Sequence, residues 1–201
     1  MAFTASVKNG LVLLSTISPL LLGFFLIMGS IFNNNIKGVL YFSGVLIASL
    51  INSLMLNPLF AGVRRGGASC DLVEWSWGSN RREDSPAYTS MFIAFTLAYL
   101  TTPMVLTNQV NGTVIATISI LFFVDAYTRF ARGCVGKLSV LLGLLFGAGM
   151  GIGWCMLFYM TGHADLLYFN DLISNNVICS RPQKQTFKCS IYKNGELVKN
   201  L

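Results

Sequence analysis

Residues 136–160 read GKLSVLLGLLFGAGMGIGWCMLFYM, and this stretch carries a single charge, at Lys137. About 20 mostly apolar residues are enough to cross the hydrocarbon of a bilayer as a helix. Gly143, Gly147 and Gly151 recur every four residues and therefore share one helix face. A glycine face lets a second helix approach closely, so the stretch predicts a membrane helix packed against another helix, in this chain or in a second copy.

The sequence outside 136–160 contains further stretches of the same kind. They are too long and too uniformly apolar for barrel strands. The composition agrees, because 54% of the residues are hydrophobic and 11% are charged, with a mean hydropathy of +0.63. A soluble domain carries about 25% charged residues. We therefore predict an all-α integral membrane protein with five transmembrane helices, the other four being 11–32, 38–60, 86–106 and 113–131.

The chain divides by composition into a transmembrane helical domain at 1–161 and a polar tail at 162–201. In the tail, Asn194-Gly195 is a strong hairpin turn signal. Cys179 and Cys189 form a disulfide there if the compartment is oxidising, and two free thiols are the alternative. The first apolar stretch has no small-residue cleavage site after it, so we expect it to be a retained helix.

Positive charge sits mainly in the loops on the N-terminal side of the predicted membrane. The loop 61–85 carries four arginines, and the turn 129–137 carries three further cations. Short cytoplasmic loops are enriched in Lys and Arg, so this side is predicted to be cytoplasmic and the tail lumenal or external. The five cations of the tail favour the opposite orientation, with the tail in the cytoplasm. The endoplasmic reticulum and a virion membrane are candidate locations.

Several classes of site are disfavoured by the residues present. The net charge of +6 includes no basic stripe with interleaved aromatic residues, so no nucleic-acid partner is expected. The single histidine, His163, leaves no metal cluster and no histidine-based acid–base pair, and no cofactor is expected. Asp125 lies four residues before Arg129, so the two form either a structural ion pair or a functional site at membrane depth.

Three segments occur in order at the predicted cytoplasmic ends of the spans. They read Asn57-PLFAGV-Arg64-Arg65, then Ser85-Pro86-Ala87-Tyr88 before the helix TSMFIAFTLAYL, then Thr128-Arg129-FARGC-Val135-GKL-Ser139. In order and side they resemble the three motifs of the type 2 phosphatidic acid phosphatase (PAP2) superfamily, over roughly residues 38–160. That resemblance implies a PAP2-like bundle with a phosphate or lipid headgroup held by Arg64, Arg65, Tyr88 and Arg129.

The catalytic groups of that family are replaced in this chain. Val135 stands at the place of the histidine nucleophile, Ser139 at that of its aspartate, and Tyr88 at that of the proton-donating histidine. Valine has no lone pair, and a nucleophile and its orienting group act as a unit. The resemblance therefore implies a catalytically inactive member that binds anionic membrane lipids or serves as a scaffold, with other membrane proteins or further copies as partners.

Three alternatives stay open. The chain is a purely structural subunit of a membrane complex or viral envelope, an active lipid phosphatase with a non-histidine nucleophile, or a channel or transporter. The candidate nucleophiles are Glu83, Asp84 and Cys134. Ser85-Pro86 is also explained as an ordinary helix start, because serine caps helices and proline suits the first turn.

Overall fold

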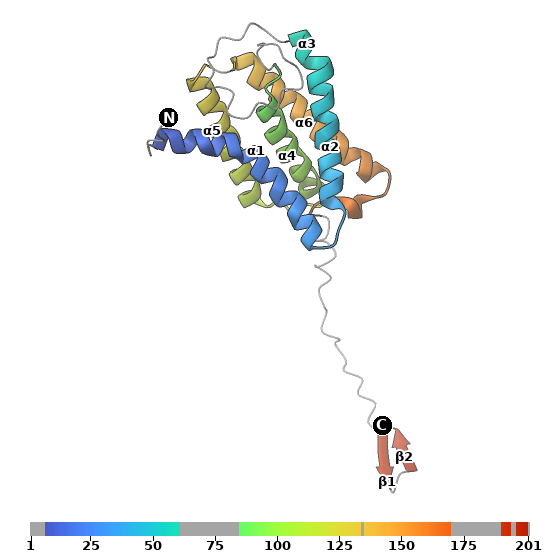
Figure 1. The fold of residues 1–201 in the computed structure, drawn as a ribbon. Coiled ribbons are helices and arrows are strands. Elements are labelled where there is room, and N and C mark those ends of the chain that lie inside the picture. Colours follow the sequence, from blue (N-terminus) through green and yellow to red (C-terminus); the bar gives the residue numbers. More distant parts are fainter. Residues whose placement is uncertain (1–6, 61–84, 134, 170–189, 194–195, 201) are drawn as a thin grey trace.

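The computed structural model describes residues 7–60, 85–133, 135–169, 190–193 and 196–200. The helices, shown in Figure 1, are α1 (Val7–Phe32), α2 (Lys37–Ile51), α3 (Asn57–Phe60), α4 (Tyr88–Leu106), α5 (Gly112–Ala131) and α6 (Lys137–Met160). A π-helical turn, η1 (Asn52–Leu56), joins α2 to α3, and a 3-10 turn, η3 (Ala164–Leu166), follows α6. Strands β1 (Ser190–Lys193) and β2 (Glu196–Asn200) pair antiparallel, with an irregular register between Ile191 and Tyr192.

Five of the described helical segments are long and apolar enough to cross a membrane, when α2, η1 and α3 are taken as one continuous segment. Their mean hydropathies run from 1.5 to 2.4, and their bounds differ from the predicted spans by no more than two residues. The prediction of five helical spans is therefore confirmed. The domain boundary at 161 and the sidedness stay predictions.

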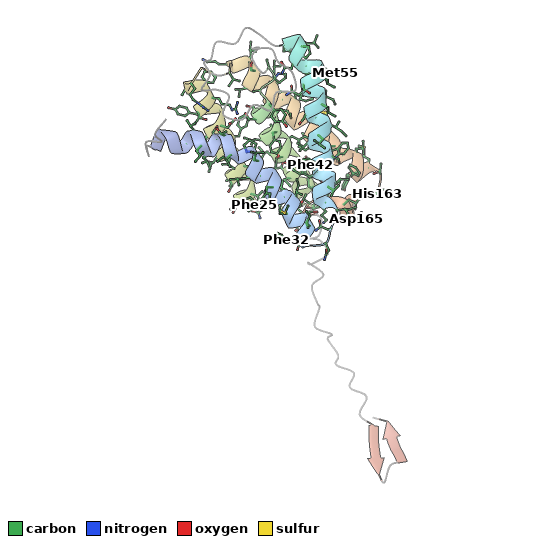
Figure 2. All side chains as sticks on the ribbon, viewed as in Figure 1. Phe25, Phe32, Phe42, Met55, His163 and Asp165 are labelled. Carbon is green, nitrogen blue, oxygen red and sulfur yellow. The ribbon has the colours of Figure 1, made fainter. Side chains whose placement is uncertain are left out.

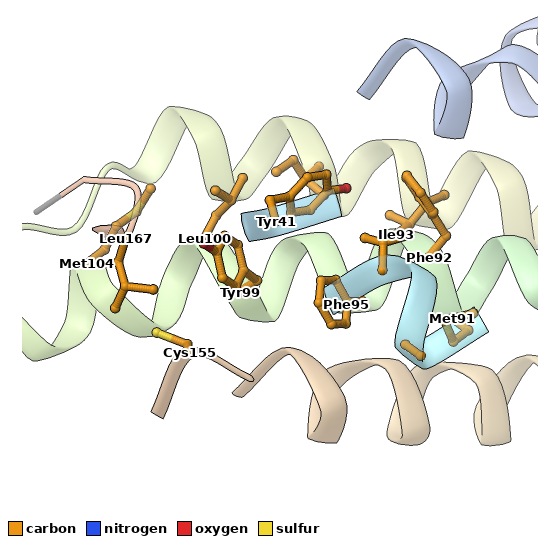
Figure 3. Close-up of a cluster of buried hydrophobic side chains, with 13 residues drawn as sticks. Tyr41, Met91, Phe92, Ile93, Phe95, Tyr99, Leu100, Met104, Cys155 and Leu167 are labelled. Carbon is orange, nitrogen blue, oxygen red and sulfur yellow. The ribbon is translucent and has the colours of Figure 1, made fainter. Parts of the chain in front are cut away.

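The core of the bundle is organised around α4. In α4, 61% of the most apolar window is buried, against 17% to 28% in the other four spans. Tyr41, Phe95 and Tyr99 pack against one another in the buried cluster drawn in Figure 3, with ring centroids 5.6 to 6.1 Å apart. The Phe95 and Tyr99 rings are stacked, and the Tyr41 ring is tilted against both. The outer surface is apolar as well, and Figure 2 labels Phe25, Phe32, Phe42 and Met55 among its exposed side chains. An apolar core and an apolar exterior together are typical of a helix bundle in lipid.

The glycine face of α6 packs against the backbone of α4. A Cβ on Gly143 would lie 2.7 Å from the Ala87 carbonyl oxygen, and one on Gly151 would lie 2.6 Å from that of Phe95. The contacts on the two helices advance by four residues together, so α4 and α6 run parallel in close contact. The helix that approaches the glycine face is thus α4 of the same chain. Because the two helices are parallel, α4 and α6 begin at the same end of the bundle.

Two spans depart from regular α-helix at prolines. Pro19 lies inside α1, which bends along its length in Figure 1, and the Ser18 hydroxyl donates to the Ser15 carbonyl at 3.1 Å. A proline cannot donate to the carbonyl four residues earlier, so Ser18 satisfies an acceptor that Pro19 leaves free. The second span continues through Pro58 to Phe60 after its π-helical turn. Its end at Phe60 agrees with the predicted span 38–60.

The first two spans form the antiparallel hairpin that the Asn33-Asn34-Asn35 turn predicts. Asn34 adopts a positive φ of 49°, a conformation that asparagine tolerates. The Ser30 hydroxyl lies 2.6 Å from the Asn35 carbonyl oxygen and accepts the amide of Gly38 at 2.8 Å. A Cβ on Gly38 would lie 2.5 Å from the Ser30 Cβ, so the absence of a side chain at Gly38 permits this close approach.

Candidate functional site

A buried carboxylate joins three helices at the end of the bundle where α4 and α6 begin and α5 ends, which we call the Arg129 end. Asp125 on α5 has no exposed surface. Its Oδ1 accepts hydrogen bonds from Ser15 Oγ of α1 at 2.7 Å and from Arg129 Nε at 3.0 Å. Its Oδ2 accepts a hydrogen bond from Thr89 Oγ1 of α4 at 2.8 Å. These hydrogen bonds give both oxygens of the buried carboxylate a partner.

The predicted ion pair between Asp125 and Arg129 is confirmed. The two residues are one turn apart on α5, and the Arg129 side chain keeps 20% of its surface exposed. Only Nε of Arg129 bonds to the carboxylate, so the carboxylate holds the guanidinium at the nitrogen nearest the side-chain methylenes. In the part of the chain that the structure describes, no hydrogen bond occupies its two terminal NH2 groups. A guanidinium can bind phosphate through two such groups at once.

Positive charge predominates around this guanidinium. Residues 125–137 contain three cations, Arg129, Arg132 and Lys137, and a single acid, Asp125. Burial lowers the pKa of Arg132, and the neighbouring charge of Arg129 lowers it further. Arg132 Nε donates to the Thr128 carbonyl at 3.2 Å, and Lys137 Nζ lies 5.6 Å from the centre of the Phe130 ring. Within 125–137 positive charge therefore outweighs negative charge, which favours the approach of anions to Arg129.

Tyr88 lies at the same end but has a different partner. Its hydroxyl is 3.2 Å from Ser49 Oγ of α2, while the next residue, Thr89, points to Asp125. Successive residues of a helix project about 100° apart, so Tyr88 faces α2 and Thr89 faces α5. No hydrogen bond between Tyr88 and Arg129 exists among the described residues. The structure thus does not bring these two predicted site residues into direct contact.

The positions that resemble the nucleophile and its aspartate are both buried. Val135 is 7% exposed and Ser139 is 4% exposed. The Ser139 carbonyl accepts the amide of Ala87 at 2.9 Å, which ties the start of α6 to the start of α4. Ser85-Pro86, just before α4, is a cis peptide bond. The second and third motif-like segments therefore meet at the Arg129 end.

Several predicted site residues lie outside the described residues. Arg64 and Arg65 fall in 61–84, as do the candidate nucleophiles Glu83 and Asp84, and Cys134 is not described. Cys179 and Cys189 fall in 170–189, so the predicted choice between a disulfide and free thiols stays a prediction.

The only histidine of the sequence lies at the opposite end of the bundle. His163 follows the last residue of α6, whereas Val135 precedes the first. Figure 2 shows His163 far from Met55, which lies near the end of the second span. A helix of 24 residues is about 36 Å long. His163 Nδ1 lies 2.9 Å from the Thr161 carbonyl oxygen. Its imidazole therefore cannot act at the Arg129 end.

Two residues of the site carry no signal in the sequence. Ser15 and Thr89 are hydroxyl residues in apolar helices, where a hydroxyl commonly bonds to its own helix, as Thr16 does to the Val12 carbonyl at 2.9 Å. Only the rotation of α1 and α4 in the bundle directs them to Asp125. The buried acid was the one available signal, because such an acid requires donors from neighbouring helices.

The fold and this site define a class: a helical chain with five segments able to span a membrane and a cationic site at one end of the bundle. Comparison of the chain with protein-family models, with curated proteins and with solved structures finds no match.

Proposed function

We propose that this chain is a multi-pass integral membrane protein that binds anionic lipid headgroups at the Arg129 end without hydrolysing them, and so acts as a binding or scaffold component of its membrane. The observation that carries the proposal is the geometry of Arg129. Asp125 holds the guanidinium at Nε, and a fifth of the side chain stays exposed. A guanidinium whose terminal groups bond to none of the described residues, at the end of a membrane bundle, suits the phosphate of a lipid.

The absence of an imidazole at this end supports an inactive protein. The PAP2-like order of the three segments places Val135 at the nucleophile position, and Val135 has no group that can form a bond to phosphorus. The one histidine of the sequence lies beyond the other end of α6. Under this proposal the chain is a PAP2-like bundle that keeps anion binding and has lost the reaction. Arg64 and Arg65 are proposed to add positive charge from the same side.

The polar tail and the sidedness complete the proposal. The Arg129 end faces the cytoplasm, where anionic lipids are concentrated, and the tail with β1 and β2 is lumenal or external. Partners are membrane lipids and either other membrane proteins or further copies of the chain.

A purely structural role is the second candidate. It is favoured because both oxygens of Asp125 already have hydrogen-bond donors within the chain. Three donors from α1, α4 and α5 satisfy this carboxylate, so its charge has a structural explanation that needs no ligand. Under this alternative the chain shows no preference among lipids.

Lipid selectivity distinguishes the two candidates. The full chain is placed in nanodiscs of phosphatidylcholine with a minor fraction of phosphatidic acid, and the lipid retained on the released protein is measured by native mass spectrometry. We expect enrichment of phosphatidic acid that falls about tenfold in Arg129→Lys, since lysine keeps the charge but lacks the bidentate fork. Lys199→Gln, which removes a charge in the tail, is the control and should retain the enrichment. Equal retention of the two lipids by the wild-type chain would leave only the structural role.

A further inference from the structure

The segment that follows α6 folds back over the end of the bundle opposite the Arg129 end, and we call residues 161–169 the strap. Gly162 has a φ of 80° and turns the chain back where α6 ends. Leu167 is 1% exposed and belongs to the same buried cluster as Met104 and Cys155, which Figure 3 shows. The strap therefore supplies part of the core at the end where α4 and α6 finish.

A second side chain of the strap reaches α1 and α4. Tyr168 Oη donates a hydrogen bond to the Leu26 carbonyl of α1 at 2.6 Å. The Tyr168 ring also meets the Tyr99 ring of α4 edge-on, with centroids 6.4 Å apart and planes at 80°. The closed strap is thus stabilised by the apolar burial of Leu167 and by the hydrogen bond of Tyr168.

Two features oppose this closed position. Phe169, the last residue of the strap, has a φ of 63°, a left-handed conformation that is unfavourable for a bulky side chain. Tyr99 Oη is buried, and none of the described residues offers it a hydrogen bond. A buried hydroxyl without a partner costs free energy that contact with water would recover. Lifting the strap would relieve both penalties, so the closed position is less stable than its contacts alone would make it.

We propose that the strap opens and closes reversibly, and that its opening admits water to the Tyr99 hydroxyl and the Cys155 thiol. The strap runs directly into the tail, so a partner that binds the tail and draws on the strap shifts it toward the open state. The strap is then the route by which events outside the membrane reach the core of the bundle. This device goes beyond the proposed function and does not depend on lipid binding at Arg129.

The native thiol of Cys155 reports on the strap. The full chain, with its other four cysteines replaced by serine, is placed in nanodiscs, and the labelling of Cys155 by N-ethylmaleimide is followed by mass spectrometry. When the strap closes faster than the reagent reacts, the labelling rate is proportional to the open fraction. Circular dichroism and size-exclusion profiles matching the wild type establish that each variant is folded.

The same chemical change at two tyrosines in contact should have opposite effects on this rate. Tyr168→Phe removes a hydrogen bond of the closed strap and is expected to raise the labelling rate about fivefold. Tyr99→Phe removes the unpaired hydroxyl that burial penalises and is expected to lower the rate about fivefold. Tyr159→Phe, at a tyrosine of α6 that is 43% exposed, is the control and should leave the rate unchanged.

Tyr41→Phe separates opening of the strap from opening of the whole bundle. It removes the hydrogen bond between Tyr41 and Thr96 and leaves the strap contacts in place, so the labelling rate should stay close to that of the wild type. Acceleration by Tyr41→Phe equal to that by Tyr168→Phe would mean that Cys155 reacts through global opening, and it overturns the proposal. A change in the same direction for Tyr168→Phe and Tyr99→Phe overturns it as well.

Discussion

Gly147 of α6 lies directly against the Met91 carbonyl of α4, so close that a Cβ on Gly147 would overlap the carbonyl oxygen. The nearest atoms all belong to the Met91 backbone, which cannot rotate away as a side chain can. In lipid, where apolar surfaces gain little from leaving the solvent, such close contact is what holds two helices together. The contact also fixes the starts of α4 and α6 beside each other at the Arg129 end.

Replacing Gly147 by alanine should therefore separate α4 from α6. We expect Gly147→Ala to destabilise the protein by about 1–3 kcal/mol, as overpacking of a close contact does. Gly149→Ala is the matched control, because nothing lies within 4 Å of a Cβ built at Gly149. The measurement is the thermal midpoint for loss of monodisperse protein in detergent. A similar midpoint for both variants would show that α4 and α6 do not pack through this face.

Removing the buried carboxylate should have a larger effect than removing one of its donors. Asp125→Ala leaves the Arg129 guanidinium without its partner, and we expect a loss of about 3 kcal/mol. Ser15→Ala removes a single hydrogen bond and should cost about 1 kcal/mol. In a double-mutant cycle, Asp125→Ala combined with Arg129→Ala should destabilise less than the sum of the single variants. Strict additivity would mean that the ion pair contributes nothing.

Two tyrosines whose rings are in contact provide a matched comparison of a paired and an unpaired hydroxyl. Tyr41 Oη lies 2.7 Å from Thr96 Oγ1, whereas Tyr99 Oη is buried and has no hydrogen-bond partner among the described residues. We expect Tyr41→Phe to destabilise by about 1 kcal/mol and Tyr99→Phe to be neutral or stabilising, as judged by thermal midpoints. The reverse order would show that Tyr99 finds a partner in the membrane that Tyr41 lacks.

The proposed sidedness can be measured by cysteine labelling. Val110, in the turn between α4 and α5, and Ala131, at the end of α5, are both exposed and lie at opposite ends of α5. In a chain whose native cysteines are replaced by serine, Ala131→Cys should react with a membrane-impermeant maleimide only after the cytoplasmic side is opened. Val110→Cys should react from the other side. The opposite pattern would reverse the orientation.

The spans were predictable because a helix that crosses a bilayer needs about 20 apolar residues, and such runs are visible in composition alone. The face of Gly143, Gly147 and Gly151 was visible because four-residue spacing repeats along a helix. What the sequence could not give is how each helix is rotated about its axis. That rotation turns Thr89 to Asp125 and Tyr88 to Ser49, so two adjacent residues face different helices.

Hydrolysis and binding measured together on the same sample test the central proposal most directly. Wild-type protein in nanodiscs containing phosphatidic acid is assayed for released inorganic phosphate and, in parallel, for retained lipid. We expect retention of phosphatidic acid above phosphatidylcholine, with phosphate release no greater than from empty nanodiscs. Catalytic release of phosphate, or equal retention of the two lipids, would contradict the proposal that this chain binds lipid phosphates without cleaving them.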